Sequence, residues 1–218
     1  YGLDANANWI DSPTAVINVP VEDIFWSVPD MRPNKGIMFV GSIGERKNLL
    51  ALIKAMPIVL QKHPDSVLHV CGGIANTGYK QKLDQISSKD DTSHAIKYLG
   101  IVDRHRLVQL LEKSAALVLP SYQETSPGVI CQAMAAGRVP VAAPVGGVPE
   151  MIEDGETGFL VDSEDFEKLA QRLIELFDDP DRAAKMGAAA RAVALTRYKA
   201  DDVADQILKF CSSILGRQ

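Results

Sequence analysis

The sequence is poor in the features that mark small secreted domains, nucleic-acid binders and membrane proteins. Its three cysteines, Cys71, Cys131 and Cys211, are far apart in apolar surroundings, so we expect buried reduced thiols and no disulfide framework. The net charge of -5 disfavours nucleic acid or an anionic membrane as the main partner. No transmembrane run, signal-peptide pattern or lipidation motif is recognisable. We therefore expect a cytoplasmic protein.

Metal ligands and one common cofactor motif are also lacking. The four histidines, His63, His69, His94 and His105, form no cluster with Cys or Asp at ligand spacing, so we expect structural or surface histidines and no metal. The G-x-G-x-x-G motif of dinucleotide-binding dehydrogenases does not follow the first clear strand, where the loop reads GSIGERKN. The dehydrogenase class is therefore disfavoured.

What the chain does contain is an alternation of short apolar runs and amphipathic helical patterns. With 218 residues and 46% hydrophobic content, it is long enough to bury a substantial core. The pattern predicts an α/β fold: a Rossmann-like parallel sheet of about six strands, helices on both faces and a C-terminal helical extension. The predicted strands are residues 14–19, 36–40, 66–71, 95–99, 115–119, 139–144 and 159–161.

Capping residues and helix breakers set the expected limits of several helices. Asn48 is a predicted N-cap of the helix after the first loop, and Ser163 is a predicted cap of the helix that Pro180 ends. Beyond Pro180 we expect two shorter helices over residues 181–194 and a final helix over residues 200–215.

Residues 115–152 organise the chain. Strands at 115–119 and 139–144 are each followed by a loop and a helix, and residues 126–128 and 146–147 provide small residues at the helix starts. In parallel sheets, ligands bind outside the carboxyl ends of the strands. Helix amino termini at that edge present free N–H groups and a positive dipole end. The expected ligand therefore carries phosphate.

Two cations stand at another helix start, in the loop GSIGERKN. Lys47 would neutralise a diphosphate as a flexible point charge, and Arg46 would add a bidentate clamp. The alternative is that both are solvated charges on a loop tip. Gly72 and Gly73, after the next strand, either allow a ligand to approach the backbone or form an ordinary tight turn.

The organising stretch contains a further set of residues: Pro120, Ser121, Glu124, Gly128, Val129, Ile130, Ala133, Met134, Ala135, Gly137, Pro140, Val141 and residues 146–150. This set resembles the signature of the group 1 (family-4, glycogen-synthase-like) retaining glycosyltransferases. The resemblance covers nearly the whole chain from about Val16. Those enzymes have two facing Rossmann-like domains, the GT-B fold, and the signature lies in the carboxyl-terminal, nucleotide-sugar-binding domain.

The resemblance implies a domain division and a set of partners. Residues 1–20 would be the interdomain segment and first strand, and residues 21–218 the donor-binding domain. The N-terminal acceptor domain would be absent from this chain. The expected partners are a nucleotide diphosphate sugar and, through that missing domain, an acceptor carbohydrate or lipid-linked saccharide. The missing domain would also be what brings the protein to the inner membrane face. No cofactor is expected.

The resemblance also implies site residues. Lys47 and Glu124 are the expected catalytic groups, the first on the diphosphate and the second on hydroxyls of the transferred sugar. The turn at 99–101 matches the place where the family holds the nucleobase. The expected donor-binding residues are Gly44, Arg46, Gly72, Gly73, Leu99, Gly100, Ile101, Ser126, Pro127, Gly128, Val129, Gln132, Gly146 and Gly147.

Two positions depart from the family pattern. Ser42 replaces an arginine, and Gln132 replaces a glutamate that accepts hydrogen bonds from ribose. An amide oxygen still accepts a hydrogen bond, but the loss of charge costs about 1 kcal/mol. Besides an active retaining glycosyltransferase, the sequence therefore leaves open an inactive nucleotide-sugar-binding or scaffolding relative. A nucleotide-sugar 2-epimerase is less well supported, because its catalytic carboxylates and histidine have no recognisable counterparts here.

Overall fold

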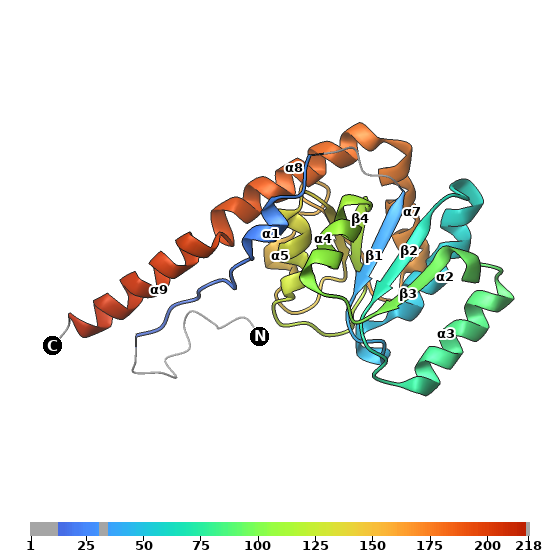
Figure 1. Cartoon of the computed structure of the whole chain (residues 1–218), viewed down its shortest axis with the longest axis horizontal. Coiled ribbons are helices and arrows are strands. Elements are labelled where there is room, and N and C mark those ends of the chain that lie inside the picture. The colour runs from blue at the N-terminus through green and yellow to red at the C-terminus, as the bar shows by residue number, and fades with distance from the viewer. Residues whose placement is uncertain (1–12, 31–34, 217–218) are drawn as a thin grey trace.

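The computed structural model describes residues 13–30 and 35–216, and within them the predicted parallel sheet is confirmed. Six strands pair in the order β3-β2-β1-β4-β5-β6, all parallel (Figure 1). The strands are β1 Gly36–Val40, β2 Val67–Cys71, β3 Ile96–Gly100, β4 Ala116–Leu119, β5 Val139–Ala142 and β6 Phe159–Leu160.

Helices cover both faces of this sheet. On one face lie α2, α3 and α7, and on the other lie α1, α4 and α5, with α8 packed on α5 (Figure 1). The helices are α1 Asp23–Trp26, α2 Leu49–Lys62, α3 Thr77–Lys89, α4 Arg104–Glu112, α5 Gly128–Ala135, α6 Val148–Met151, α7 Phe166–Asp178, α8 Pro180–Arg197 and α9 Ala200–Leu215, with 3-10 turns η1 Glu45–Lys47 and η2 Ser93–Ala95.

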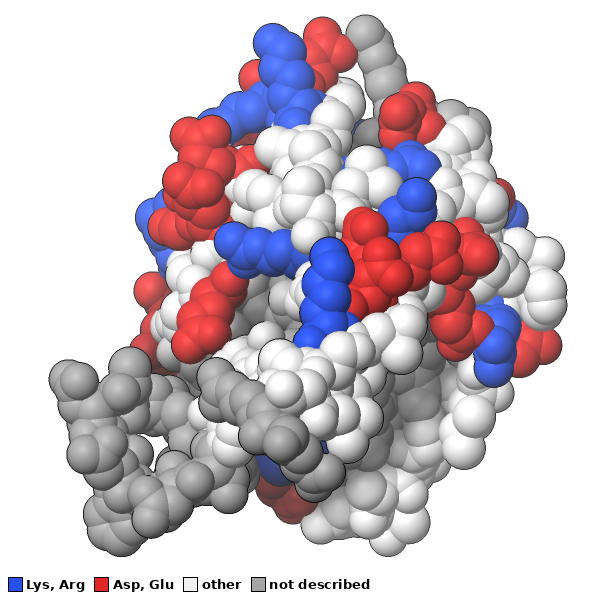
Figure 2. Space-filling model, turned by 90° about the vertical axis from the view of Figure 1, so that its left-hand side faces the viewer, with Lys and Arg blue, Asp and Glu red and all other residues white. Residues whose placement is uncertain are grey.

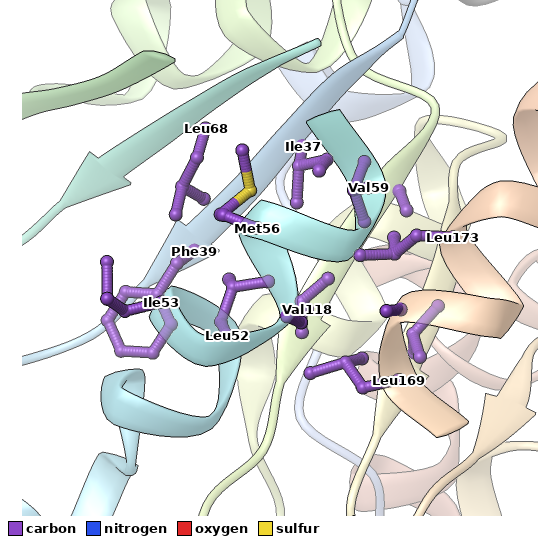
Figure 3. Packing of buried hydrophobic residues seen from close by; sticks show 14 of the residues in the cluster. Ile37, Phe39, Leu52, Ile53, Met56, Val59, Leu68, Val118, Leu169 and Leu173 are labelled. Atoms are coloured by element: carbon purple, nitrogen blue, oxygen red, sulfur yellow. The ribbon is translucent and has the colours of Figure 1, made fainter. Parts of the chain in front are cut away.

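The larger hydrophobic core lies between the sheet and the pair α2 and α7. Figure 3 shows side chains of α2 inserted between the β1–β2 surface and α7. Because strands of a parallel sheet are buried on both faces, their sequences are nearly continuous apolar runs, as predicted. Fully buried members of this core include Ile37, Phe39, Leu52, Met56, Val59, Leu68, Val118 and Leu173.

The predicted strand at residues 14–19 is wrong. The chain there has no regular secondary structure, and Val16 and Val19 are 84% and 56% exposed. A strand needs a neighbour to accept its hydrogen bonds, and the only pairing nearby in the described residues is the isolated bridge of Val21 with Lys199. The remainder of the predicted interdomain segment, residues 1–12, lies outside the described residues.

The prediction of two short helices at residues 181–194 is also wrong, because α8 is continuous through Gly187. A Cβ atom at Gly187 would lie 2.2 Å from the carbonyl oxygen of Gly137. The glycine therefore permits close packing of α8 on the α5–β5 turn and does not break the helix.

Neither of the two predicted caps bonds its helix through its side chain, although Asn48 does occupy the N-cap position of α2. Asn48 has a positive φ of 48° and caps nothing with its side chain, whose Nδ2 donates to the carbonyl oxygen of Ser163 at 2.7 Å. Asp165, not Ser163, caps α7 by accepting from the N–H of Lys168. Asn48 and Ser163 instead contact each other, through the Asn48 side chain and the Ser163 carbonyl oxygen. Local sequence does not reveal this tertiary contact.

The C-terminal extension is confirmed, since α9 projects from the body of the domain (Figure 1). Cys211 on α9 is exposed, so the prediction of three buried thiols holds only for Cys71 and Cys131. No helix in the described part of the chain has the length and apolarity to span a bilayer. On the face in Figure 2, acidic and basic side chains are interspersed.

Candidate functional site

The site lies at the carboxyl edge of the sheet, where the strand order reverses. From β1 the chain passes to β2 and β3 on one side and then returns to β4 on the other side of β1. The loops after β1 and β4 therefore diverge from neighbouring strands and leave a crevice between them, which is where α/β sheets of this kind bind ligands. The loop after β1 carries Lys47, and the loop after β4 carries Glu124.

Lys47 and Glu124 form an ion pair across this crevice. The Lys47 Nζ atom is 2.6 Å from Glu124 Oε1, and the two side chains are only 13% and 7% exposed. The aliphatic part of Lys47 lies beside Gly41, where a Cβ atom would be 3.4 Å from its methylene carbons. The two groups expected to be catalytic are thus brought together from positions 77 residues apart.

One main-chain hydrogen bond and one from a side chain join the two loops beside this pair. The N–H of Tyr122 donates to the carbonyl oxygen of Arg46 at 2.9 Å. Arg46 Nη1 donates to the carbonyl oxygen of Gln123 at 2.9 Å and lies 4.0 Å from Glu124 Oε2. The guanidinium therefore faces the Glu124 loop.

The glycines after β5 hold the other side of the Glu124 loop. A Cβ atom at Gly146 would lie 1.7 Å from the carbonyl oxygen of Glu124. The N–H of Gly147 donates to the carbonyl oxygen of Thr125 at 2.9 Å. The amide of Gly147 is therefore engaged by the protein. The sequence predicts that Gly146 and Gly147 present amides to an anion, whereas in the structure they pack against the Glu124 loop.

Gly72 has a similar structural role. Its φ is +146°, and a Cβ atom would lie 1.9 Å from the carbonyl oxygen of Gly41. Its N–H donates to the carbonyl oxygen of Gly100 at 2.7 Å. The close approach that this glycine permits is to the neighbouring loop of the protein itself. Gly73 accepts from the N–H of Ile43, and the buried Gly44 has an extended backbone.

The amino terminus of α5 presents open amides. Pro127 has no N–H, and its carbonyl oxygen accepts from Ile130. The N–H groups of Gly128 and Val129, in the first turn, have no hydrogen-bond partner within residues 13–30 and 35–216. Gln132 follows Gly128 by one helical turn and is half-buried. These open amides are the feature on which the predicted anion site depends, and anion binding here stays a prediction.

The start of α2 is less open. The N–H of Leu50, in the first turn, donates to the hydroxyl of Tyr79 at 2.9 Å, and η1 intervenes between the loop and the helix. A second anion-facing helix end is predicted here, and one of its first-turn amides is engaged by Tyr79. No local pattern in the sequence signals a tyrosine of α3 in this position.

Two hollows border the site. One of about 350 Å³ is lined by Arg46, Gln123, Glu124, Thr125 and Ser126. A larger one of about 520 Å³ lies between residues 16–19, the Ser126 region and the 146–147 turn.

The turn after β3 lies at the same edge. Gly100 has a φ of +68° with open space where a Cβ would stand, and Ile101 is 87% exposed. Leu99 is half-buried at the end of the strand. All of the predicted donor-binding residues thus lie at the carboxyl edge, but Gly72 and Gly147 are engaged by the protein.

Fold and site together define a class: a doubly wound α/β domain with a cation, a carboxylate and open helix amides at its switch point, as in nucleotide-binding domains. Comparison with known proteins makes the class specific. Residues 22–193 match the family described as Glycosyl transferases group 1, and the chain belongs to this family.

Individual relatives agree. The D-inositol 3-phosphate glycosyltransferase of Streptomyces scabiei is 33% identical over 161 residues, which cover 71% of this chain and 36% of that protein. The chain thus spans about a third of the length of this relative.

Solved structures agree as well. Anabaena Alr3699/HepE in complex with UDP-glucose superposes with a TM-score of 0.74 and 25% identity, over 83% of this chain and 49% of that one. The C-terminal domain of the group 1 family protein LpcC from Francisella tularensis matches in fold, with a TM-score of 0.72 and 24% identity, over 84% of this chain and 96% of that one. The chain therefore has the architecture of the carboxyl-terminal half of a GT-B fold.

Proposed function

We propose that this chain binds the donor in a retaining glycosyltransferase, which transfers a sugar from a nucleotide diphosphate sugar to an acceptor hydroxyl. The observation that carries the proposal is the position of the Lys47–Glu124 ion pair. The pair lies at the switch point of the sheet, at the same edge as the open amides of α5. The UDP-glucose bound by Alr3699/HepE supports a donor of this chemical class.

The expected chemistry follows from the charges. When the glycosidic bond to the diphosphate breaks, negative charge develops on the leaving phosphate oxygens. The Lys47 ammonium and the N–H groups of Gly128 and Val129 would stabilise that charge without reorganising. The Glu124 carboxylate would accept hydrogen bonds from hydroxyls of the transferred sugar and hold it in position.

Donor binding would require a change at the ion pair. Lys47 Nζ is held by Glu124, so a diphosphate would compete with or share that contact. Gln132 would face the ribose with a neutral amide. Together with Ser42, these features favour weak donor binding, and an inactive donor-binding relative is the second candidate function.

Turnover separates the two candidates. The full-length protein would be incubated with labelled UDP-, GDP- and ADP-sugars and an acceptor panel, and release of nucleoside diphosphate would be followed. We expect one donor to be consumed and the product to keep the donor's anomeric configuration, as judged by NMR. Donor binding without turnover would identify the inactive relative. An inverted product would contradict the proposed mechanism.

A further inference from the structure

The loop that carries Glu124 is fastened at four consecutive residues. Tyr122 donates its N–H to Arg46, Gln123 accepts from the Arg46 guanidinium, Glu124 is paired with Lys47, and Thr125 accepts from Gly147. Two of these four contacts belong to a single residue, Arg46.

The direction of the Arg46 side chain separates two roles for it. As a phosphate ligand, its guanidinium would extend into the crevice with its donors open. Instead Nη1 is bonded to the carbonyl oxygen of Gln123 at 2.9 Å and lies 4.0 Å from Glu124 Oε2. One nitrogen of the guanidinium thus lies near both the carbonyl oxygen of Gln123 and the carboxylate of Glu124, while the side chain as a whole is 53% exposed.

A donor phosphate that draws Lys47 away from Glu124 would leave the carboxylate without its nearest cation. Among the described residues Arg46 is the next cation to Glu124, and its bond to Gln123 is separate from the contact of Lys47 with Glu124. A hydrogen bond to the main chain on one side and a charge near the carboxylate on the other would keep Glu124 in place while Lys47 shifts.

We propose that Arg46 is a positioning residue, which fixes Glu124 by holding the backbone of its loop, and is not itself a phosphate ligand. This inference rests on the proposed function, because it assigns Arg46 a role at the same site. Under this proposal Arg46 does not supply the charge of the arginine that Ser42 replaces.

The first test compares binding with turnover in the full-length protein. In Arg46→Ala, we expect the Kd for UDP, GDP and ADP to stay within about twofold, while kcat falls about tenfold, since one charge-assisted hydrogen bond is lost. Arg46→Lys restores part of kcat, because a lysine can still donate to Gln123. Arg182→Ala, an exposed arginine at the opposite edge, is the control for loss of charge. A tenfold rise in Kd with unchanged kcat would overturn the proposal.

A double substitution tests whether Arg46 acts through Glu124. With Glu124→Gln already present, Arg46→Ala should cause little further loss of kcat, because the group that it positions has been altered. Two losses that multiply in full would show that Arg46 acts independently, and would contradict the positioning role.

A third measurement does not depend on any donor. Among residues 122–125 the N–H of Tyr122 is the one that donates a hydrogen bond within the described residues, to the carbonyl oxygen of Arg46. Hydrogen exchange should show this amide exchanging about tenfold faster in Arg46→Ala than in wild type, because the loop opens more often, with no such change in Arg182→Ala. If exchange accelerates but no nucleotide binds, the fastening stands and the proposed function fails. Unchanged exchange would refute the fastening itself.

Discussion

The ammonium of Lys47 lies 2.6 Å from the carboxylate of Glu124, and both side chains are largely shielded from water. Removing one partner of such a pair leaves a charge that is poorly solvated, and this costs more than the pair contributes. The pair therefore has two consequences that can be measured separately, one for stability and one for ligand binding.

For stability, Lys47→Ala should lower the free energy of unfolding by about 1–3 kcal/mol, because Glu124 loses its closest partner. The Lys47→Ala, Glu124→Gln double variant should lose less than the sum of the single losses, by about 1 kcal/mol. Urea denaturation of the four proteins measures this coupling.

The control is Lys62→Ala, which breaks the more exposed pair with Asp178 at the opposite edge. We expect a loss of at most about 1 kcal/mol there. Additive losses at Lys47 and Glu124 would mean that the two groups do not interact in solution.

Gly146 provides a second test, of backbone packing at the site. Gly146→Ala would place a Cβ atom 1.7 Å from the carbonyl oxygen of Glu124, at a φ of +57°. We expect a loss of stability above about 3 kcal/mol, from strain and displacement of the loop. Thermal or urea unfolding measures this loss.

Gly155 is the matched control, with a φ of +83° and open space where a Cβ would stand. Gly155→Ala should cost about 1 kcal/mol from backbone strain alone. Equal losses for the two variants would show that the Glu124 loop yields freely to the extra methyl group.

The strands were predictable because of their burial. A strand covered by helices on both faces is apolar at nearly every position, so β1 was predicted at its true limits and β4 within one residue. The segment at 14–19 has similar composition but no neighbouring strand. Pairing is a property of the whole fold, so composition alone could not separate these cases.

The site was predictable in part. The resemblance indicated Lys47 and Glu124, and the open amides of α5 followed from the small residues at its start. Their direct pairing, and the use of Gly147 and Leu50 N–H groups by the protein, depend on backbone positions set by distant elements. Such contacts leave no periodic or local pattern in the sequence.

Gln132 allows a test of the ribose position. Gln132→Glu should raise donor affinity several-fold, since a charged acceptor gains about 1 kcal/mol over an amide. Titration of the nucleotide sugar into both proteins measures the change. Gln81→Glu, an exposed position on α3, controls for the added charge. Unchanged or weaker binding in Gln132→Glu would mean that the pocket is built around the amide.

The buried cysteines predict loss of stability at alkaline pH. Burial raises the pKa of the Cys71 and Cys131 thiols from 9.0 to about 11. As the pH rises, these thiols ionise in the unfolded state before they ionise in the folded state. Their contribution to the free energy of unfolding is therefore complete below about pH 9 and is lost as the pH rises towards about 11.

Chemical denaturation between these pH values measures the effect. The free energy of unfolding should fall less steeply with pH in Cys131→Ala than in wild type. Cys211→Ala, at an exposed thiol, should keep the wild-type slope. A Cys131→Ala slope equal to that of wild type would indicate that its thiol ionises equally in both states.

The central claim is that Lys47 and the open end of α5 bind a pyrophosphate. Calorimetric titration of the full-length protein with UDP, GDP and ADP tests it most directly and also identifies the base. We expect one of the three to bind, and Lys47→Ala to weaken it by at least about tenfold, as for loss of a charge-assisted contact. Binding of the same strength in wild type and Lys47→Ala, or no binding of any of the three, would contradict the account.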